Sequence, residues 1–302
     1  MSQGASQEGL TILVTGGTGQ VGHELIRELG AVGTVLAPSR RELDLASTDS
    51  IRDCVRHLRP TLIVNAGAFT AVDAAEDDES TARRVNTDAP AILAEEGLRL
   101  GAAMIHYSTD YVFDGSKGAP YTEDDPTNPR SVYGVTKRDG ELAVAASGAP
   151  YLVLRTSWVY GLRGRNFLTS IFQQAREREE LRVVRDQVGT PTWSRMIAMT
   201  TARIVTRGVA NGLIQYIAAN KGIYHLASAD GTSRHGFAEA ALALDPQRQA
   251  GRRVSVLPIL TSEYPTRAPR PANSSLDVSR LSRTFGLRLP GWREQLRLAL
   301  TS

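Results

Sequence analysis

The sequence predicts an α/β fold in which helices cover both faces of a parallel sheet, with a smaller α/β region at the C-terminal end. Short apolar segments alternate with longer segments of helical periodicity from residue 10 to about residue 160, which is the pattern of a doubly wound sheet. The first apolar segment runs directly into the glycine-rich stretch Gly16–Gly22. After Gly161 the alternation becomes irregular, so we expect a separate substrate-binding region there.

The composition is that of an ordinary globular protein of 302 residues, with 41% hydrophobic and 22% charged residues. The net charge of +3 is not concentrated in a basic block, so we expect neither a nucleic acid nor a membrane as partner. The single cysteine, Cys54, excludes an intrachain disulfide. We expect a cytoplasmic monomer or homodimer with a disordered tail at residues 1–9 and no secretory signal.

The glycine-rich stretch predicts a nucleotide site. Leu10–Val14 predicts a buried strand and Gln20–Leu29 a helix, so Gly16, Gly19 and Gly22 lie at the turn between them. Glycines at such a turn let the backbone approach a pyrophosphate, which the free N–H groups of the helix N-terminus attract. These features indicate a Rossmann-type fold.

The residues after the second predicted strand, Thr34–Ala37, indicate which dinucleotide binds. An NAD site usually carries an acidic residue there for the ribose 2′-hydroxyl, but this chain has Ser39, Arg40 and Arg41. Because guanidinium groups bind phosphate well, we expect NADPH, with NADH possible.

The next segments extend the sheet. Asp44 lies where an acidic residue can contact the adenine, and Thr61–Ala68 predicts a strand whose small final residues leave room for a cofactor. A long helix over about Ser80–Leu100 and a strand at Ala102–Tyr107 follow. We expect His106, on this strand, to be a packed or hydrogen-bonded histidine.

A tyrosine and a lysine four residues apart predict the reactive centre. Tyr133 and Lys137 share one face of the predicted helix Tyr133–Ala146. A neighbouring ammonium favours the phenolate, so we expect Lys137 to lower the pKa of Tyr133. Thr109, at the end of the preceding strand, is expected to join Tyr133 in binding one carbonyl oxygen.

The remaining elements are less regular. The sequence predicts strands at Tyr151–Arg155, Leu181–Val184, Gly222–Leu226 and Val254–Ile259, and helices at about Asn166–Glu179, Ile197–Arg207, Arg234–Leu244, Val278–Phe285 and Trp292–Leu300. We assign residues 10–160 and about 181–215 to the NADP(H)-binding domain, and about 161–180 and 216–302 to the substrate-binding domain. We find no cluster with the spacing of metal ligands and expect no metal.

Seven segments make the chain similar to the extended short-chain dehydrogenase/reductases, and among them to members that reduce a dTDP-linked 4-keto-6-deoxyhexose. They follow the family's order from about residue 10 onward: Gly16–Gly22, Asn65–Asp73, His106–Phe113, Val132–Lys137, Arg155–Tyr160, Asp186–Thr192 and Tyr264–Ser274.

The resemblance implies an oxidoreductase of polysaccharide biosynthesis and, together with the strand ends, assigns residues to three roles. The catalytic residues are expected to be Thr109, Tyr133 and Lys137. The substrate-binding residues are expected to be Asp110, Tyr111, Trp158, Arg270 and Asn273. The cofactor-binding residues are expected to be Gly16, Gly19, Gln20, Val21, Gly22, Ser39, Arg40, Asp44, Leu45, Ala66, Gly67, Ala68, Tyr107, Tyr133 and Lys137.

Two alternatives stay open at this point. A 4-ketoreductase for another dTDP-deoxysugar would share nearly all of these residues. A non-catalytic NADP-binding regulatory subunit, similar to the β subunit of methionine adenosyltransferase, is a reading from a different class, and the intact Thr109, Tyr133 and Lys137 argue against it. Dehydration is disfavoured because sugar 4,6-dehydratases tend to carry a glutamate where this chain has Tyr111.

Overall fold

The computed structural model describes residues 9–247 and 254–301, so the predicted tail, Gly9 apart, lies outside the described residues. A six-stranded sheet forms the centre, with the order β10-β5-β4-β3-β1-β2 and all neighbours parallel. Its strands are β1 (Thr11–Thr15), β2 (Thr34–Leu36), β3 (Leu62–Asn65), β4 (Ala103–Thr109), β5 (Tyr151–Thr156) and β10 (Gly222–His225). The predicted doubly wound parallel sheet is confirmed.

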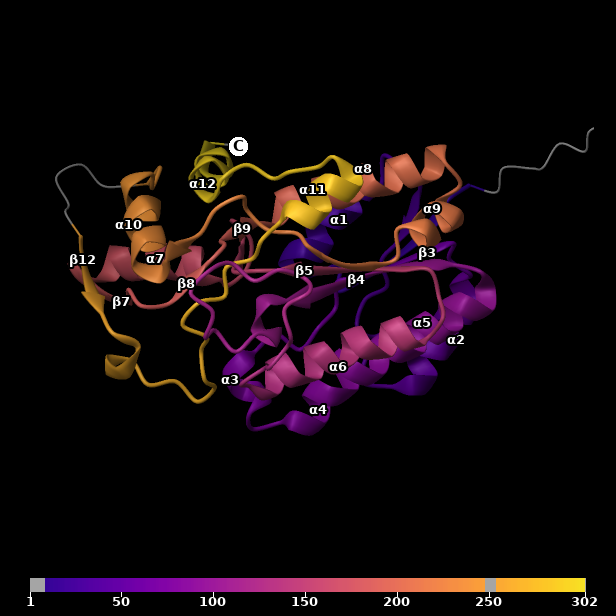
Figure 1. Ribbon diagram of the computed structural model, residues 1–302, viewed down its shortest axis with the longest axis horizontal. Coiled ribbons are helices and arrows are strands. Elements are labelled where there is room, and N and C mark those ends of the chain that lie inside the picture. The colour runs from indigo at the N-terminus through magenta and orange to yellow at the C-terminus, as the bar shows by residue number, and fades with distance from the viewer. Residues whose placement is uncertain (1–8, 248–253, 302) are drawn as a thin grey trace, which may run out of the picture.

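Helices cover both faces of this sheet (Figure 1). One face carries α2 (Thr48–Leu58), α5 (Ala89–Leu100) and α6 (Val132–Ala146), and the other carries α1 (Gln20–Leu29), α8 (Ser194–Ala210), α9 (Leu213–Ala219) and α11 (Ser279–Phe285). Ile12 and Val14 pack into one hydrophobic core, whereas Leu13 between them packs into the other. Side chains alternate between the faces of a strand, so both faces of the sheet are buried.

The predicted long helix before β4 is divided. It consists of α4 (Glu79–Arg83), the π-helical turn η1 (Arg84–Asp88) and α5, and the short α3 (Val72–Ala75) precedes them. The π-turn contains Asn86, which is buried. Its amide accepts a hydrogen bond from Phe69 N at 2.8 Å and donates one to Phe69 O at 3.1 Å. The turn thereby fixes the loop that follows β3.

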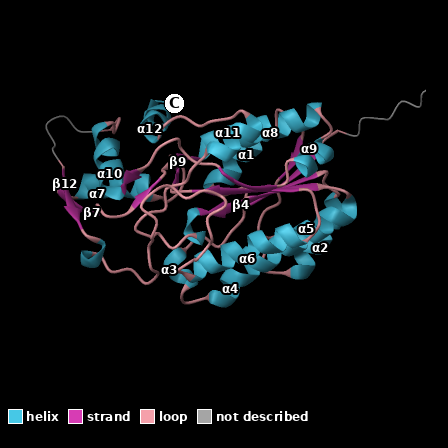
Figure 2. Ribbon diagram, in the orientation of Figure 1, coloured by secondary structure: helices cyan, strands magenta, loops and turns pink. Residues whose placement is uncertain are grey.

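The smaller region lies beyond the carboxyl ends of the central strands (Figure 2). It contains α7 (Phe167–Glu177), β7 (Glu180–Val184), α10 (Arg234–Ala243), β12 (Ser255–Ile259) and α12 (Trp292–Thr301), with β7 and β12 paired in parallel. Its core contains Tyr160, Leu168, Phe237 and Trp292. Short segments connect it to the sheet: η2 (Asp110–Val112), β6 (Val159–Tyr160), β8 (Val188–Gly189), β9 (Thr192–Trp193), β11 (Thr232–Ser233) and η3 (Thr261–Glu263).

Two strands, β10 and β7, pair within a different region from the one to which the sequence assigned them. β10 pairs with β5 at the edge of the central sheet, whereas β7 pairs with β12 in the smaller region. A short apolar strand has the same sequence pattern in either sheet, so its partner is decided by tertiary packing. Helix α8 packs against α1, within the part predicted for the nucleotide-binding domain.

Candidate functional site

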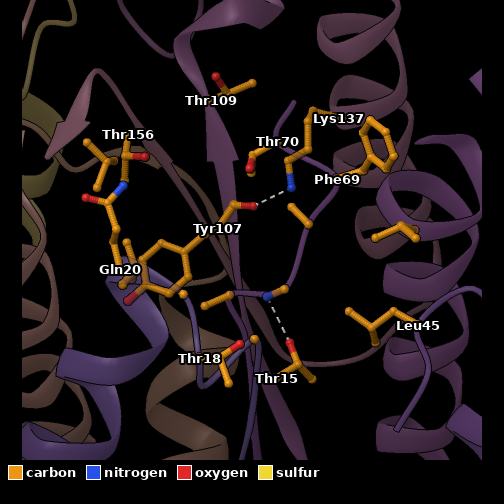
Figure 3. Close-up of a pocket in the computed structure, with 18 of the residues that line it drawn as sticks. Thr15, Thr18, Gln20, Leu45, Phe69, Thr70, Tyr107, Thr109, Lys137 and Thr156 are labelled. Carbon is orange, nitrogen blue, oxygen red and sulfur yellow. Dashed lines mark hydrogen bonds between the residues drawn. The ribbon is translucent and has the colours of Figure 1, made fainter. Parts of the chain in front are cut away.

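The site lies where the order of the strands in the sheet reverses, between β1 and β3. Strand β2 lies on one side of β1 and β3 on the other, so the loops after β1 and β3 diverge and leave a crevice at their carboxyl ends. Gly16 has a φ of 68°, and a Cβ atom there would lie 2.7 Å from the Cα of Gly67. A cavity of about 880 Å³ opens at this point (Figure 3), within the size range of cofactor sites.

The first part of the cavity suits a pyrophosphate. Helix α1 begins after Gly19 and has no acidic residue in its first turn, so its free N–H groups present only positive potential. The cavity wall includes every predicted cofactor-binding residue except Gly22. Gly22 packs beneath the wall, where a Cβ would lie 2.1 Å from Gly16 O. These residues fit a dinucleotide.

The ribose end of the wall differs from the prediction in one respect. Ser39 and Arg40 line the cavity, but the carboxylate of Glu42 folds back and accepts a hydrogen bond from Ser39 N at 2.7 Å. Bonds to Ser39 hold the pKa of Glu42 below its usual value. The turn in which Glu42 N and Leu43 N both donate to Ser39 O brings this carboxylate beside Ser39.

The predicted catalytic residues come together on one wall. Thr109 ends β4, and Tyr133 and Lys137 lie in the first two turns of α6. Ser131 caps this helix by accepting a hydrogen bond from Gly134 N at 3.2 Å. The Tyr133 phenol hydrogen-bonds with Thr109, and Lys137 Nζ donates to Tyr107 O at 2.7 Å (Figure 3).

The sequence predicted that Lys137 lowers the pKa of Tyr133, but in the structure the pKa of Tyr133 is raised. Burial raises the pKa of Tyr133, its hydrogen bond with Thr109 opposes that rise, and the charge of Asp110 adds to it. Burial also lowers the pKa of Lys137 to about 8. The prediction counted the ammonium and neglected desolvation, which acts on both groups. Tyr133 therefore keeps its proton at neutral pH.

Three predicted substrate-binding residues line the far end of the cavity. Asp110 is buried and accepts hydrogen bonds from Thr109 Oγ1 at 3.1 Å and Ser157 Oγ at 2.8 Å, and burial raises its pKa. The ring of Tyr111 meets that of Tyr133 edge-on, with centroids 5.6 Å apart. Trp158 has a φ of 45°, a rare backbone conformation for a non-glycine residue.

The other two predicted substrate-binding residues are not on the cavity wall. Arg270 donates to Asp73 Oδ2 at 2.6 Å, and its guanidinium lies 5.9 Å from the ring centroid of Tyr111. Asn273 donates to Lys117 O at 2.7 Å. Arg270 is thus next to the site, whereas the Asn273 side chain holds the loop that follows β4.

The sequence did not point to Arg234, which lines the cavity at the start of α10. Its guanidinium carbon lies 3.7 Å from the ring centroid of Trp158, and its side chain hydrogen-bonds with Tyr111. Asp110 attracts its charge, whereas Arg270 repels it. No local signal marks this arginine, because only the docking of the smaller region brings α10 to the ends of β4 and β5.

No group of three or more His, Cys, Asp or Glu side chains within residues 9–247 and 254–301 could hold a metal ion. Over the same residues, none of the helices combines the length and the apolarity needed to cross a membrane.

Comparisons with known proteins agree with the site. The family model described as RmlD substrate binding domain matches residues 10–302. A dTDP-4-dehydrorhamnose reductase from Burkholderia thailandensis is 46% identical over 94% of this chain and 96% of that protein. Another, from Salmonella typhimurium, is 39% identical over 97% of each chain. The crystal structure of the Bacillus anthracis dTDP-4-dehydrorhamnose reductase in complex with NADP superposes with a TM-score of 0.85 at 30% identity, covering 97% of this chain and 99% of that one.

Proposed function

Because the chain belongs to the RmlD substrate binding domain family, we propose that it reduces the 4-keto group of dTDP-4-dehydro-L-rhamnose to give dTDP-L-rhamnose, with NADPH as the preferred cofactor and NADH as a possible one. The observation that carries this proposal is the placement of Thr109, Tyr133 and Lys137 between a pyrophosphate-binding loop and a wall formed by Tyr111 and Trp158.

The reaction adds a hydride to the carbonyl carbon and a proton to its oxygen. NADPH, when bound, supplies the hydride. Tyr133 and Thr109 bind the carbonyl oxygen, and Tyr133 donates its proton to that oxygen as it becomes an alkoxide. The raised pKa of Tyr133 suits this role, since the donor must carry a proton at neutral pH. Lys137, whose Nζ lies at the cavity wall, would bind the ribose hydroxyls of the cofactor.

The experiment that tests the proposal follows NADPH absorbance after adding the dTDP-linked 4-keto sugar prepared in situ. We expect oxidation of NADPH and formation of dTDP-L-rhamnose, identified by NMR. A second arm uses a different dTDP-4-keto-6-deoxyhexose. Faster turnover of that sugar would favour a 4-ketoreductase for another deoxysugar. NADPH binding without turnover of either sugar would favour a regulatory subunit.

Substitution of Arg234 should weaken binding of the sugar substrate without affecting binding of the cofactor. We propose that its guanidinium, stacked on Trp158 and close to Asp110, binds the diphosphate of the dTDP-sugar. A charged hydrogen bond is worth about 1.5–3 kcal/mol, so Arg234→Gln should raise the KM for the sugar by about 10- to 100-fold. The dissociation constant of NADPH should not change.

The matched control is Arg293→Gln, since Arg293 also stacks on a tryptophan, with its guanidinium carbon 4.4 Å from the ring centroid of Trp292. Arg293 is not among the residues that line the cavity. We expect wild-type kinetics from this variant. An unchanged KM in Arg234→Gln would refute the assignment.

Substitutions of Arg40 and Glu42 test the preference for NADPH over NADH. Arg40 lines the cavity and Arg41 does not, so Arg40→Ala should raise the KM for NADPH about tenfold and leave that for NADH nearly unchanged. Glu42→Gln should lower the KM for NADPH, because it removes the negative charge that lies beside Ser39 N. Arg41→Ala is the control. Equal effects of Arg40→Ala on both cofactors would contradict the proposed preference for NADPH.

A further inference from the structure

A row of buried polar residues crosses the central sheet beneath the site. Thr15 on β1 is in register with Asn65 on β3, and Asn65 is in register with His106 on β4. Each of the three side chains is at most 1% exposed, and their neighbours on the strands are apolar. Polar groups are costly to bury unless they are hydrogen-bonded, so the row requires an explanation.

The hydrogen bonds along the row assign the proton of the His106 ring. Thr15 Oγ1 accepts from Gly67 N at 3.0 Å (Figure 3) and approaches Asn65 Oδ1 to 2.6 Å, a separation typical of an O–H···O bond. Asn65 therefore turns its Nδ2 toward His106 Nδ1, at 3.0 Å. Because Nδ1 accepts this bond, the neutral ring carries its proton on Nε2. Burial and the neighbouring Lys137 hold the pKa of His106 well below its usual value.

The row ends at Lys137. His106 Nε2 lies 3.4 Å from Lys137 Nζ, which also donates to Tyr107 O at 2.7 Å. A neutral amine has a lone pair that can accept the Nε2–H, whereas an ammonium has only donors. Glu141, one turn further along the same helix, acts in the opposite direction, because its charge favours the ammonium.

We propose that His106 is a positioning residue, which directs its Nε2–H at Lys137 Nζ and thereby favours the neutral form of that lysine in the cofactor-free protein. The proposal rests on the proposed function only for the role of Lys137.

The ring tautomer is tested directly by NMR of the protein labelled with ¹⁵N-histidine. The chain has five histidines, and His106→Phe identifies the signal of His106 by its loss. We expect the Nε2–H tautomer, without titration between about pH 6 and about pH 9. An Nδ1–H tautomer would overturn the proposal, and this measurement needs no variant to be active.

The effect on Lys137 is tested by the pH dependence of NADPH binding. The ammonium binds ribose hydroxyls better than the amine does, so wild-type affinity should be constant below about pH 8, the pKa of Lys137, and fall above it. His106→Phe removes the N–H that favours the amine. The fall should then begin at a measurably higher pH, but still below the ordinary lysine value of ~10.4, because Lys137 remains buried.

Two further variants keep the test decisive. Asn65→Asp presents only acceptors to Nδ1, which moves the ring proton to Nδ1 and should shift the fall in the same direction even if His106→Phe does not fold. His225→Phe removes another fully buried imidazole, on β10, and should leave the pH dependence unchanged. An unshifted fall in both His106→Phe and Asn65→Asp would refute the inference. Shifted profiles without reduction of the sugar would refute only the proposed function.

Discussion

Tyr133→Phe is expected to lower kcat/KM for the dTDP-linked keto sugar by about 100- to 10,000-fold, the range of general acid catalysis. Phenylalanine preserves the ring and its edge-on contact with Tyr111, at a centroid distance of 5.6 Å. It removes only the hydroxyl that hydrogen-bonds with Thr109. Steady-state oxidation of NADPH measures the effect.

Cofactor binding distinguishes lost chemistry from a damaged site. The affinity for NADPH, measured by fluorescence, should stay within about twofold of wild type, because the lost interaction is made mainly in the transition state. Tyr160→Phe makes the same chemical change at a buried tyrosine in the core of the smaller region and should have little effect on turnover. Wild-type rates in Tyr133→Phe would rule out the phenol as the proton donor.

The strand-to-helix turn at Gly16–Gly22 shows what the sequence could predict. Apolar strands, glycines and helical periodicity are local signals, and they were sufficient for the parallel sheet, the dinucleotide loop and the meeting of Thr109 with Tyr133. The strand ends of a doubly wound sheet always lie at one edge. Residues at those ends could therefore be grouped before their contacts were known.

Other features depend on contacts between distant segments. Arg234 reaches the cavity only because α10 docks beside Trp158, and nothing in its local sequence indicates this. The rise in the pKa of Tyr133 comes from burial, which a sequence pattern does not measure. β10 joins the central sheet because an edge of β5 is free to pair with it. The roles of the individual site residues remain predictions.

A buried ion pair behind the catalytic helix should have the largest effect on stability. Arg155 on β5 donates to both carboxylate oxygens of Glu141 on α6, at 2.9 and 2.7 Å. Both side chains are at most 3% exposed. Removing one partner leaves an uncompensated charge in the interior, so Glu141→Leu or Arg155→Met alone should lower the free energy of unfolding by about 3–5 kcal/mol.

The double variant Arg155→Met/Glu141→Leu should recover most of that loss, because two apolar side chains of similar volume avoid the cost of burying charges. Arg182→Ala is the control, since its pair with Glu263 is largely exposed and exposed pairs contribute about 1 kcal/mol or less. Urea unfolding of the four proteins beside wild type measures these differences. If the losses in the free energy of unfolding simply add in the double variant, the two charges act independently. The ion pair would then not be the interaction that joins α6, with Tyr133 and Lys137, to the sheet.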